Sequence, residues 1–249
     1  MALIHSLEKN GNFLFRYRGQ FPILLFLLAV PVIYFTDYKL LNENKTLNYI
    51  YLGLSIFISF LGQYIRAVAI GTSQKATSGR NKYEQIAEAL NTKGIYSTLR
   101  HPLYLGNYFM WLGIIMFTFN IWFIVSFTLL FWVYYERIMF AEERFLERKF
   151  GQMYIDWSLK VPAFIPSFKN YEKTEIPFSF KTILRREYSG ISATIISFLF
   201  IDFFKRLFEM KEVKFELYQG IILAIAILYS LILRTLKHKT KILFEEDRS

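Results

Sequence analysis

Residues 94–107 read Gly94-Ile95-Tyr96-Ser97-Thr98-Leu99-Arg100-His101-Pro102-Leu103-Tyr104-Leu105-Gly106-Asn107, and this stretch decides how the chain is organised. Proline is favoured at the first position of a helix because its missing N–H costs nothing there, so Pro102 predicts a helix start. The polar residues before it then lie at the mouth of that helix, beside backbone N–H groups that lack partners. Two interpretations are open: a binding site, or an ordinary loop whose Arg100 faces lipid headgroups.

The composition indicates a membrane protein. The chain has 249 residues, of which 54% are hydrophobic and 20% are charged, as expected for apolar spans separated by charged segments. It has no cysteine, which excludes disulfides, thiolate metal sites and cysteine nucleophiles. Its three histidines are scattered, so no metal site is expected. The net charge of +10 suits nucleic acid or an anionic membrane face, and its distribution favours the membrane, without nucleic acid as a partner.

Apolar runs predict the fold class, an all-α integral membrane protein with about six transmembrane helices. The runs cover residues 21–36, 49–71, 103–119, 121–140, 191–204 and 217–233. Asn120 alone separates the third run from the fourth, so these two form a tight helical hairpin. We expect three parts: an N-terminal arm and first span (1–48), a core (49–166), and a linker with two further spans and a basic tail (167–249).

The basic residues predict the orientation. Six spans place both termini on one side, and most of the 30 Lys and Arg residues fall on that side. Cytoplasmic segments are rich in Lys and Arg, so we expect the termini and the 94–107 stretch to face the cytoplasm, at a bacterial inner membrane.

The hairpin predicts a site. Its two helices have similar lengths, so Arg100 and His101 should return beside Glu142 and Glu143, at a helix packing distance of about 8–10 Å. A carboxylate pair at a membrane face can hold a cationic ligand. The alternative is a solvated helix extension in which these carboxylates pair with neighbouring arginines.

The motifs in their order identify a family resemblance. A span with an internal Arg is followed by Gly-x-Tyr-x-x-x-Arg-His-Pro-x-Tyr-x-Gly, a tight hairpin, Glu-Glu, Phe-Gly-x-x-Tyr and Val-Pro-x-Phe-Ile-Pro. Over about residues 49–166, this order resembles the isoprenylcysteine carboxyl methyltransferase and phospholipid methyltransferase superfamily. The resemblance implies an integral membrane enzyme that uses S-adenosyl-L-methionine.

The resemblance also implies site residues. Those expected to bind the cofactor are Glu88, Ala89, Leu90, Asn91, Tyr96, His101, Pro102, Leu103, Tyr104, and Glu142 or Glu143. Arg137 approximates the family's substrate-side arginine, one residue out of register.

The methyl acceptor is expected to be a membrane lipid. Arg66 lies inside a span, and Arg80 follows Thr77-Ser78-Gly79, a composition that suits a phosphate oxyanion. This version of the motifs resembles the bacterial branch that includes lipid A 1-phosphate methyltransferases. An ionised phosphate oxygen needs no strong general base. Four arginines are the candidates to position it: Arg66, Arg80, Arg100 and Arg137.

Other functions remain open. The acceptor could be a prenylcysteine-type carboxylate or, less favoured by the arginines, a phosphatidylethanolamine amine. Membrane sterol reductases share a helical architecture but bind NADPH, and the Glu142-Glu143 pair favours a cationic methyl donor instead. A small transporter or assembly factor would place its polar residues near mid-membrane, whereas this chain concentrates them at one face.

Overall fold

The fold is known from a computed structural model, which describes residues 2–73, 85, 87–246 and 248. All regular elements within these residues are helices, which confirms the all-α class. The α-helices are α1 (Leu3–Tyr17), α2 (Phe21–Phe35), α3 (Lys39–Glu43), α4 (Lys45–Gly71), α5 (Pro102–Met116), α6 (Ile121–Phe150), α7 (Gln152–Ser158), α8 (Phe180–Met210) and α9 (Leu217–Lys239). Two 3-10 turns join them, η1 (Gly94–Ser97) and η2 (Phe168–Asn170).

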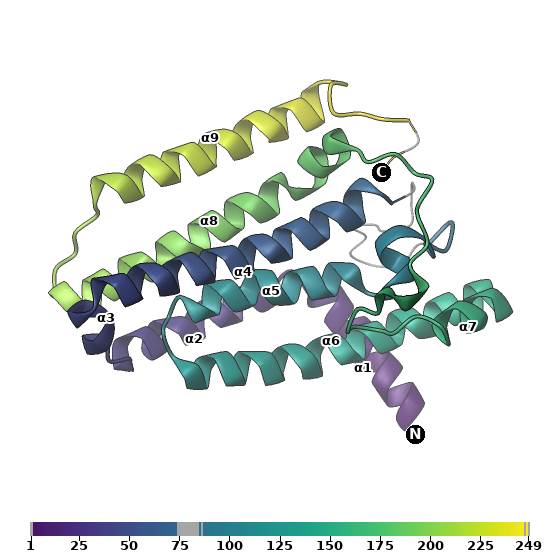
Figure 1. The fold of residues 1–249 in the computed structure, drawn as a ribbon, viewed down its shortest axis with the longest axis horizontal. Coiled ribbons are helices and arrows are strands. Elements are labelled where there is room, and N and C mark those ends of the chain that lie inside the picture. The colour runs from purple at the N-terminus through teal and green to yellow at the C-terminus, as the bar shows by residue number, and fades with distance from the viewer. Residues whose placement is uncertain (1, 74–84, 86, 247, 249) are drawn as a thin grey trace.

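The long helices run side by side along the long axis of the molecule (Figure 1). Both chain ends lie at the end that carries α7, as an even number of spans predicts, and α3 lies at the opposite end. The turn between α5 and α6 also lies at the α3 end, so the start of α5 and the end of α6 meet near the chain termini.

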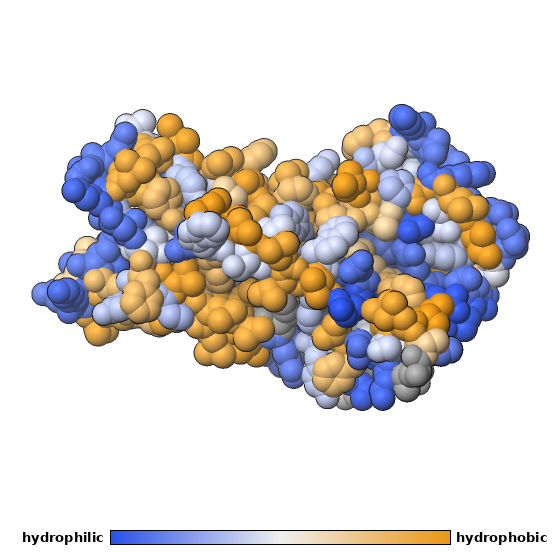
Figure 2. All heavy atoms as spheres, turned by 90° about the horizontal axis from the view of Figure 1, so that it is seen from below, coloured by the Kyte–Doolittle hydropathy of each residue, from blue (hydrophilic) through white to orange (hydrophobic). Residues whose placement is uncertain are grey.

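Within the described part of the chain, three helices are long and apolar enough to cross a membrane: α4, α6 and α9. Helices α2 and α5 have 15 residues each, which is short for a span, and α8 has 31 residues but carries charges toward both of its ends. The surface shows an apolar middle between two polar ends (Figure 2). The structure thus supports a membrane protein and three of the six predicted spans.

The helix boundaries follow local signals. Pro102 is the first residue of α5, as predicted. The side chains of Asn44, Asn120 and Ser179 cap α4, α6 and α8 by accepting backbone N–H groups at 2.9–3.0 Å. The sequence did not predict α1 or α3, and α8 begins eleven residues before the apolar run at 191, because these segments carry too many polar residues to stand out as apolar runs.

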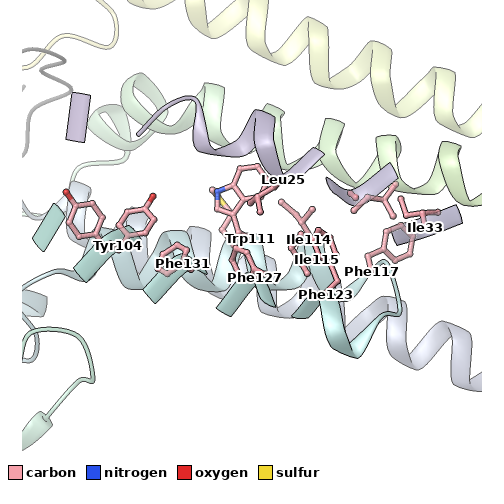
Figure 3. Close-up of a cluster of buried hydrophobic side chains, with 14 of the residues drawn as sticks. Leu25, Ile33, Tyr104, Trp111, Ile114, Ile115, Phe117, Phe123, Phe127 and Phe131 are labelled. Carbon is pink, nitrogen blue, oxygen red and sulfur yellow. The ribbon is translucent and has the colours of Figure 1, made fainter. Parts of the chain in front are cut away.

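Aromatic and aliphatic side chains form a row between α2, α5 and α6, from Tyr104 at one end to Phe117 and Ile33 at the other (Figure 3). Phe127 and Phe131 of α6 are fully buried in this row. The ring of Phe131 stacks on Tyr135 with centroids 4.1 Å apart. This packing fixes how α6 lies against α5.

Helices α4 and α5 approach each other at backbone level. A Cβ atom at Gly113 would overlap the backbone of Ser55 and Ser59 on α4, and one at Gly62 would overlap Met110 on α5. Ser59 also donates a hydrogen bond to the Met110 carbonyl at 2.8 Å. Small residues at such crossings permit close packing between apolar helices.

Helix α8 is attached to α4 by polar contacts. Both oxygens of Glu187 accept hydrogen bonds from Arg66 at 2.7 Å, and Arg66 also donates to Asn107 Oδ1 at 2.5 Å. One turn along, Gln63 Nε2 donates to Thr194 Oγ1 at 2.9 Å. The buried cation of α4 therefore finds its anion on a helix outside the predicted core.

We expect Gly113→Ala to destabilise the fold, because the new methyl group must push α4 and α5 apart. Overpacking of this kind destabilises a protein by about 1–3 kcal/mol. This is more than the stabilisation expected from the higher helix propensity of alanine. Thermal unfolding of the purified protein in detergent measures the effect. Gly53→Ala is the matched control, since a Cβ at this α4 position meets nothing within 4 Å. Equal melting temperatures for the two variants would contradict the close approach.

Candidate functional site

The turn before α5 is held by its backbone. The N–H groups of Arg100 and His101 donate to the carbonyls of Pro162 and Ala163 at 2.9 and 3.1 Å, and Ser167 N–H donates to the Thr98 carbonyl at 2.9 Å. The Val-Pro-x-Phe-Ile-Pro motif is therefore joined to the Arg-His-Pro turn by backbone hydrogen bonds. Two motifs about sixty residues apart in the sequence form one structural unit.

The hairpin brings His101 to the carboxylate pair, as predicted. Nε2 of His101 lies 2.9 Å from Glu143 Oε1, and Nδ1 lies 3.6 Å from Glu142 Oε2. Both carboxylates come from α6, one residue apart, and each side chain is 25% exposed while His101 is 6% exposed. The histidine is thus buried beneath the two carboxylates, and the carboxylates remain accessible to a ligand.

Two further side chains complete this cluster. Tyr104 donates its hydroxyl to Glu142 Oε1 at 2.7 Å, and its ring stacks on His101 and packs against Tyr135. Arg100 forms an ion pair with Glu143, with Nε 3.0 Å from Oε1, and donates from Nη1 to the Ser158 carbonyl at 2.8 Å. Both carboxylates are therefore oriented by residues of the 100–104 turn. We call His101, Tyr104, Glu142 and Glu143 the acidic cluster.

The acidic cluster changes how His101 titrates. Burial by itself lowers the pKa of His101, but the hydrogen bonds and charges of Glu142 and Glu143 outweigh burial, and the pKa is raised above its usual 6.5. Nearby, burial raises the pKa of Tyr96 to about 12, with Glu142 adding to the shift and the cations Arg186 and Arg66 opposing it. Tyr96 is therefore neutral and lies within electrostatic reach of the cluster.

The remaining residues predicted to bind the cofactor differ in their exposure to solvent. Glu88 is exposed, and Ala89, Leu90 and Asn91 are half-buried in the irregular segment that leads to η1. Pro102 is buried at the start of α5, and Leu103 beside it is half-buried. Their roles toward a cofactor stay predictions.

Of the four predicted arginines, the three that the structure describes have different binding partners. Arg66 is bound by Glu187 and Asn107, so an acceptor would have to compete with Glu187 for it. Arg100 is bound to the acidic cluster. Arg137 donates to the Val133 carbonyl of its own helix at 2.9 Å, and Arg80 lies outside the described residues. Their roles toward the acceptor stay predictions.

The structure adds residues that sequence reasoning did not single out. Glu187 is 2% exposed and neutralises Arg66, while Asn107 links Arg66 to Tyr135 by donating to its hydroxyl at 3.3 Å. The signal for Glu187 was available, because a cation inside an apolar span requires an anion nearby. The sequence could not say which of the 20 acidic residues supplies it.

The chemistry of the acidic cluster fits S-adenosyl-L-methionine. Two accessible carboxylates can bind an ammonium group, and electron-rich tyrosine rings beside them can contact a sulfonium cation. The fit includes both Glu142 and Glu143, since His101 contacts both.

The segment of the chain that contains this site is similar to known proteins. Residues 49–153 match the phospholipid methyltransferase family. The chain is 37% identical over 112 residues to a protein-S-isoprenylcysteine O-methyltransferase of Schizosaccharomyces pombe, covering 43% of this chain and 45% of that protein. It is 31% identical over 114 residues to the Saccharomyces cerevisiae protein of the same name, covering 45% and 48%.

A third relative, the protein-S-isoprenylcysteine O-methyltransferase of Tribolium castaneum, is 28% identical over 120 residues, covering 48% of this chain and 43% of its own. The matched part thus spans less than half the length of these relatives, and no solved structure matches the chain significantly. These matches confirm the predicted resemblance: residues 49–153 are similar to the isoprenylcysteine carboxyl methyltransferase and phospholipid methyltransferase superfamily.

Proposed function

We propose that this protein is an S-adenosyl-L-methionine-dependent O-methyltransferase that acts at a membrane surface on the carboxylate of a hydrophobically anchored, prenylcysteine-like acceptor. The observation that carries the proposal is the contact of His101 and Tyr104 with Glu142 and Glu143, inside the segment that matches the family. Residues 49–166 form the catalytic core of this proposal, flanked by 1–48 and 167–249.

The acidic cluster binds the cofactor. Glu142 and Glu143 hold its positively charged amino group, and Tyr96 with residues 88–91 contacts the remainder. When bound, the cofactor supplies a methyl group made electrophilic by the sulfonium charge. His101, Tyr104 and Arg100 hold both carboxylates in fixed positions before the cofactor arrives, so little order has to be created on binding.

The site residues then have a limited chemical task. An ionised carboxylate oxygen attacks the methyl carbon in line, a C–O bond forms as the C–S bond breaks, and the C–S electron pair remains on sulfur. Opposite charges disappear in this step, so the buried surroundings of His101 and Tyr104 favour it by excluding water. No proton has to be removed from the acceptor, so the chain needs no general base.

The carboxylate acceptor replaces the lipid A phosphate that the arginine pattern predicted. The relatives are named for isoprenylcysteine, and none of those compared is named for a lipid phosphate. Arg66, the arginine expected to hold the phosphate within the membrane, is already paired with Glu187. We place the reaction on the cytoplasmic face, in agreement with the distribution of Lys and Arg.

A direct test offers the purified protein radiolabelled S-adenosyl-L-methionine with two acceptors, N-acetyl-S-farnesylcysteine and lipid A. We expect base-labile methyl ester to form on the farnesylcysteine. Its methyl ester, which has no free carboxylate, is the control and should accept no label. Transfer to lipid A alone would restore the phosphate acceptor, and transfer to neither acceptor despite saturable cofactor binding would reject the carboxylate proposal.

We expect Glu142→Gln and Glu143→Gln each to weaken binding of S-adenosyl-L-methionine about tenfold or more, because an ionic contact to the amino group, worth about 1.4 kcal/mol or more, is lost. Isothermal calorimetry in detergent measures this. Glu147→Gln is the matched control: it lies on the same helix but pairs with Arg144. Unchanged affinity in both site variants would end the cofactor assignment.

The raised pKa of His101 predicts a pH-dependent stability. Protonated His101 stabilises the folded state through Glu142 and Glu143, so its contribution is fully present below about pH 6.5 and is lost as the pH rises through the raised folded-state pKa. Melting temperatures of the wild type and of His101→Gln should therefore differ most below about pH 6.5 and converge as the pH rises through the raised pKa of His101. A difference that is independent of pH would show that His101 is not protonated in the fold.

A further inference from the structure

A second cavity lies far from the acidic cluster. It is a groove of about 710 Å³ between α4 and α8, bordered by α9, and its volume falls in the range of about 300–1,000 Å³ that is typical of ligand sites. Tyr38 and Asn42 line one end, next to α3, so this end of the groove faces the side of the bundle opposite to α7 and the chain termini (Figure 1). None of the residues proposed to bind the cofactor lines this space.

The lining changes from polar to apolar along the groove. The end beside α3 holds polar side chains: Asn42, Lys45, Asn48, Asp202, Lys205, Arg206 and Glu209. The body is apolar, with Leu52, Ile56 and Phe60 from α4 facing Ile195 and Phe198 from α8. From Leu52 to Gln63, helix α4 rises about 16 Å, close to half of the roughly 30 Å hydrocarbon core of a bilayer. This is the length and polarity profile of one lipid leaflet.

The inner end of the groove is closed. Gln63 and Thr194 both line it, are both 8% exposed, and are joined by their 2.9 Å hydrogen bond. The Arg66–Glu187 pair lies one helical turn beyond. A chain that enters from the α3 end therefore stops before the site of the proposed reaction.

Lys205 gives the polar end a cation that is available to a ligand. Its Nζ lies 4.7 Å from the ring centroid of Tyr38 and 4.6 Å from that of Phe117, and both rings line the groove. Among the described residues, Nζ has no hydrogen bond and no ion pair within 4.0 Å. The nearest carboxylates interact with it only through longer-range charge: Asp202 pairs with Arg206 and accepts from Gln219, and Glu209 accepts from Asn42.

We propose that this groove binds a membrane phospholipid, with the phosphate on Lys205 and an acyl chain along α4 and α8 as far as Gln63. A half-buried ammonium group without a paired anion favours an anionic headgroup, and the apolar body accepts the chain that such a headgroup carries. The headgroup lies at the end opposite to the acidic cluster, so this lipid belongs to the other leaflet and is not the methyl acceptor. The site is independent of the proposed methyl transfer.

The test compares three ligands on the delipidated protein in detergent, by native mass spectrometry and melting temperature. The ligands are phosphatidylglycerol, a diacylglycerol with the same chains, and glycerol phosphate without chains. We expect phosphatidylglycerol to bind one to one and raise the melting temperature, with the other two binding at least tenfold more weakly. Equal binding of the diacylglycerol would refute the role of the phosphate, and equal binding of glycerol phosphate would refute the lipid.

Variants locate the site. Lys205→Gln should weaken phosphatidylglycerol binding about tenfold, and Ile195→Trp should do the same by filling the groove while leaving Lys205 in place. Lys205→Arg should retain binding, which separates loss of charge from misfolding. Lys211→Gln, at the exposed end of the same helix, is the control and should bind like the wild type. Wild-type affinity in both Lys205→Gln and Ile195→Trp would overturn the proposal.

Discussion

The structure depends on the neutralisation of one largely buried cation. Arg66 lies in the last two turns of the apolar helix α4, where an unpaired charge is costly, and the two oxygens of Glu187 accept its hydrogen bonds at 2.7 Å. The third contact of Arg66, to Asn107, extends this link to α5. Helices α4, α5 and α8 are thereby held together at one level. The α8 helix, which lies outside the family segment, is thus a structural part of the core rather than an appended anchor.

The acidic cluster is built on this frame by the hairpin. The start of α5, next to Arg100 and His101, lies beside the C-terminal part of α6. The buried rings shared by α5 and α6 fix how far along α5 the side chains of Glu142 and Glu143 lie. The carboxylates are then oriented and partly exposed, which suits a cationic cofactor. The groove proposed to bind a phospholipid depends on the same frame, because Gln63 and Thr194 line it one turn from Arg66. The two proposed ligand sites, of opposite charge preference, thus lie toward opposite ends of α4.

The sequence predicted what local rules and chain geometry determine. Pro102 marked the start of α5, Asn120 marked the hairpin, and the hairpin brings His101 to the carboxylates as predicted, although α6 has 30 residues and α5 only 15. Glu187 was not predicted, because side-chain pairing across 121 residues depends on how α8 packs. Helix α1 was not predicted either, since its polar composition gives no apolar run. Its buried residues are Gly11 and Phe15. The comparisons favour the alternative carboxylate acceptor over the lipid phosphate expected from arginine content, because that content does not reveal which arginines already have partners.

The turn that precedes α5 has a further consequence for how such a protein can change over time. Its link to residues 162 and 163 is made by the main-chain N–H groups of residues 100 and 101 and the main-chain carbonyls of residues 162 and 163, so this link does not depend on which side chains these residues carry. Substitutions around the site can therefore accumulate without dismantling the scaffold. An arrangement of this kind lets acceptor preference diverge between descendants while the architecture that binds the methyl donor is inherited unchanged.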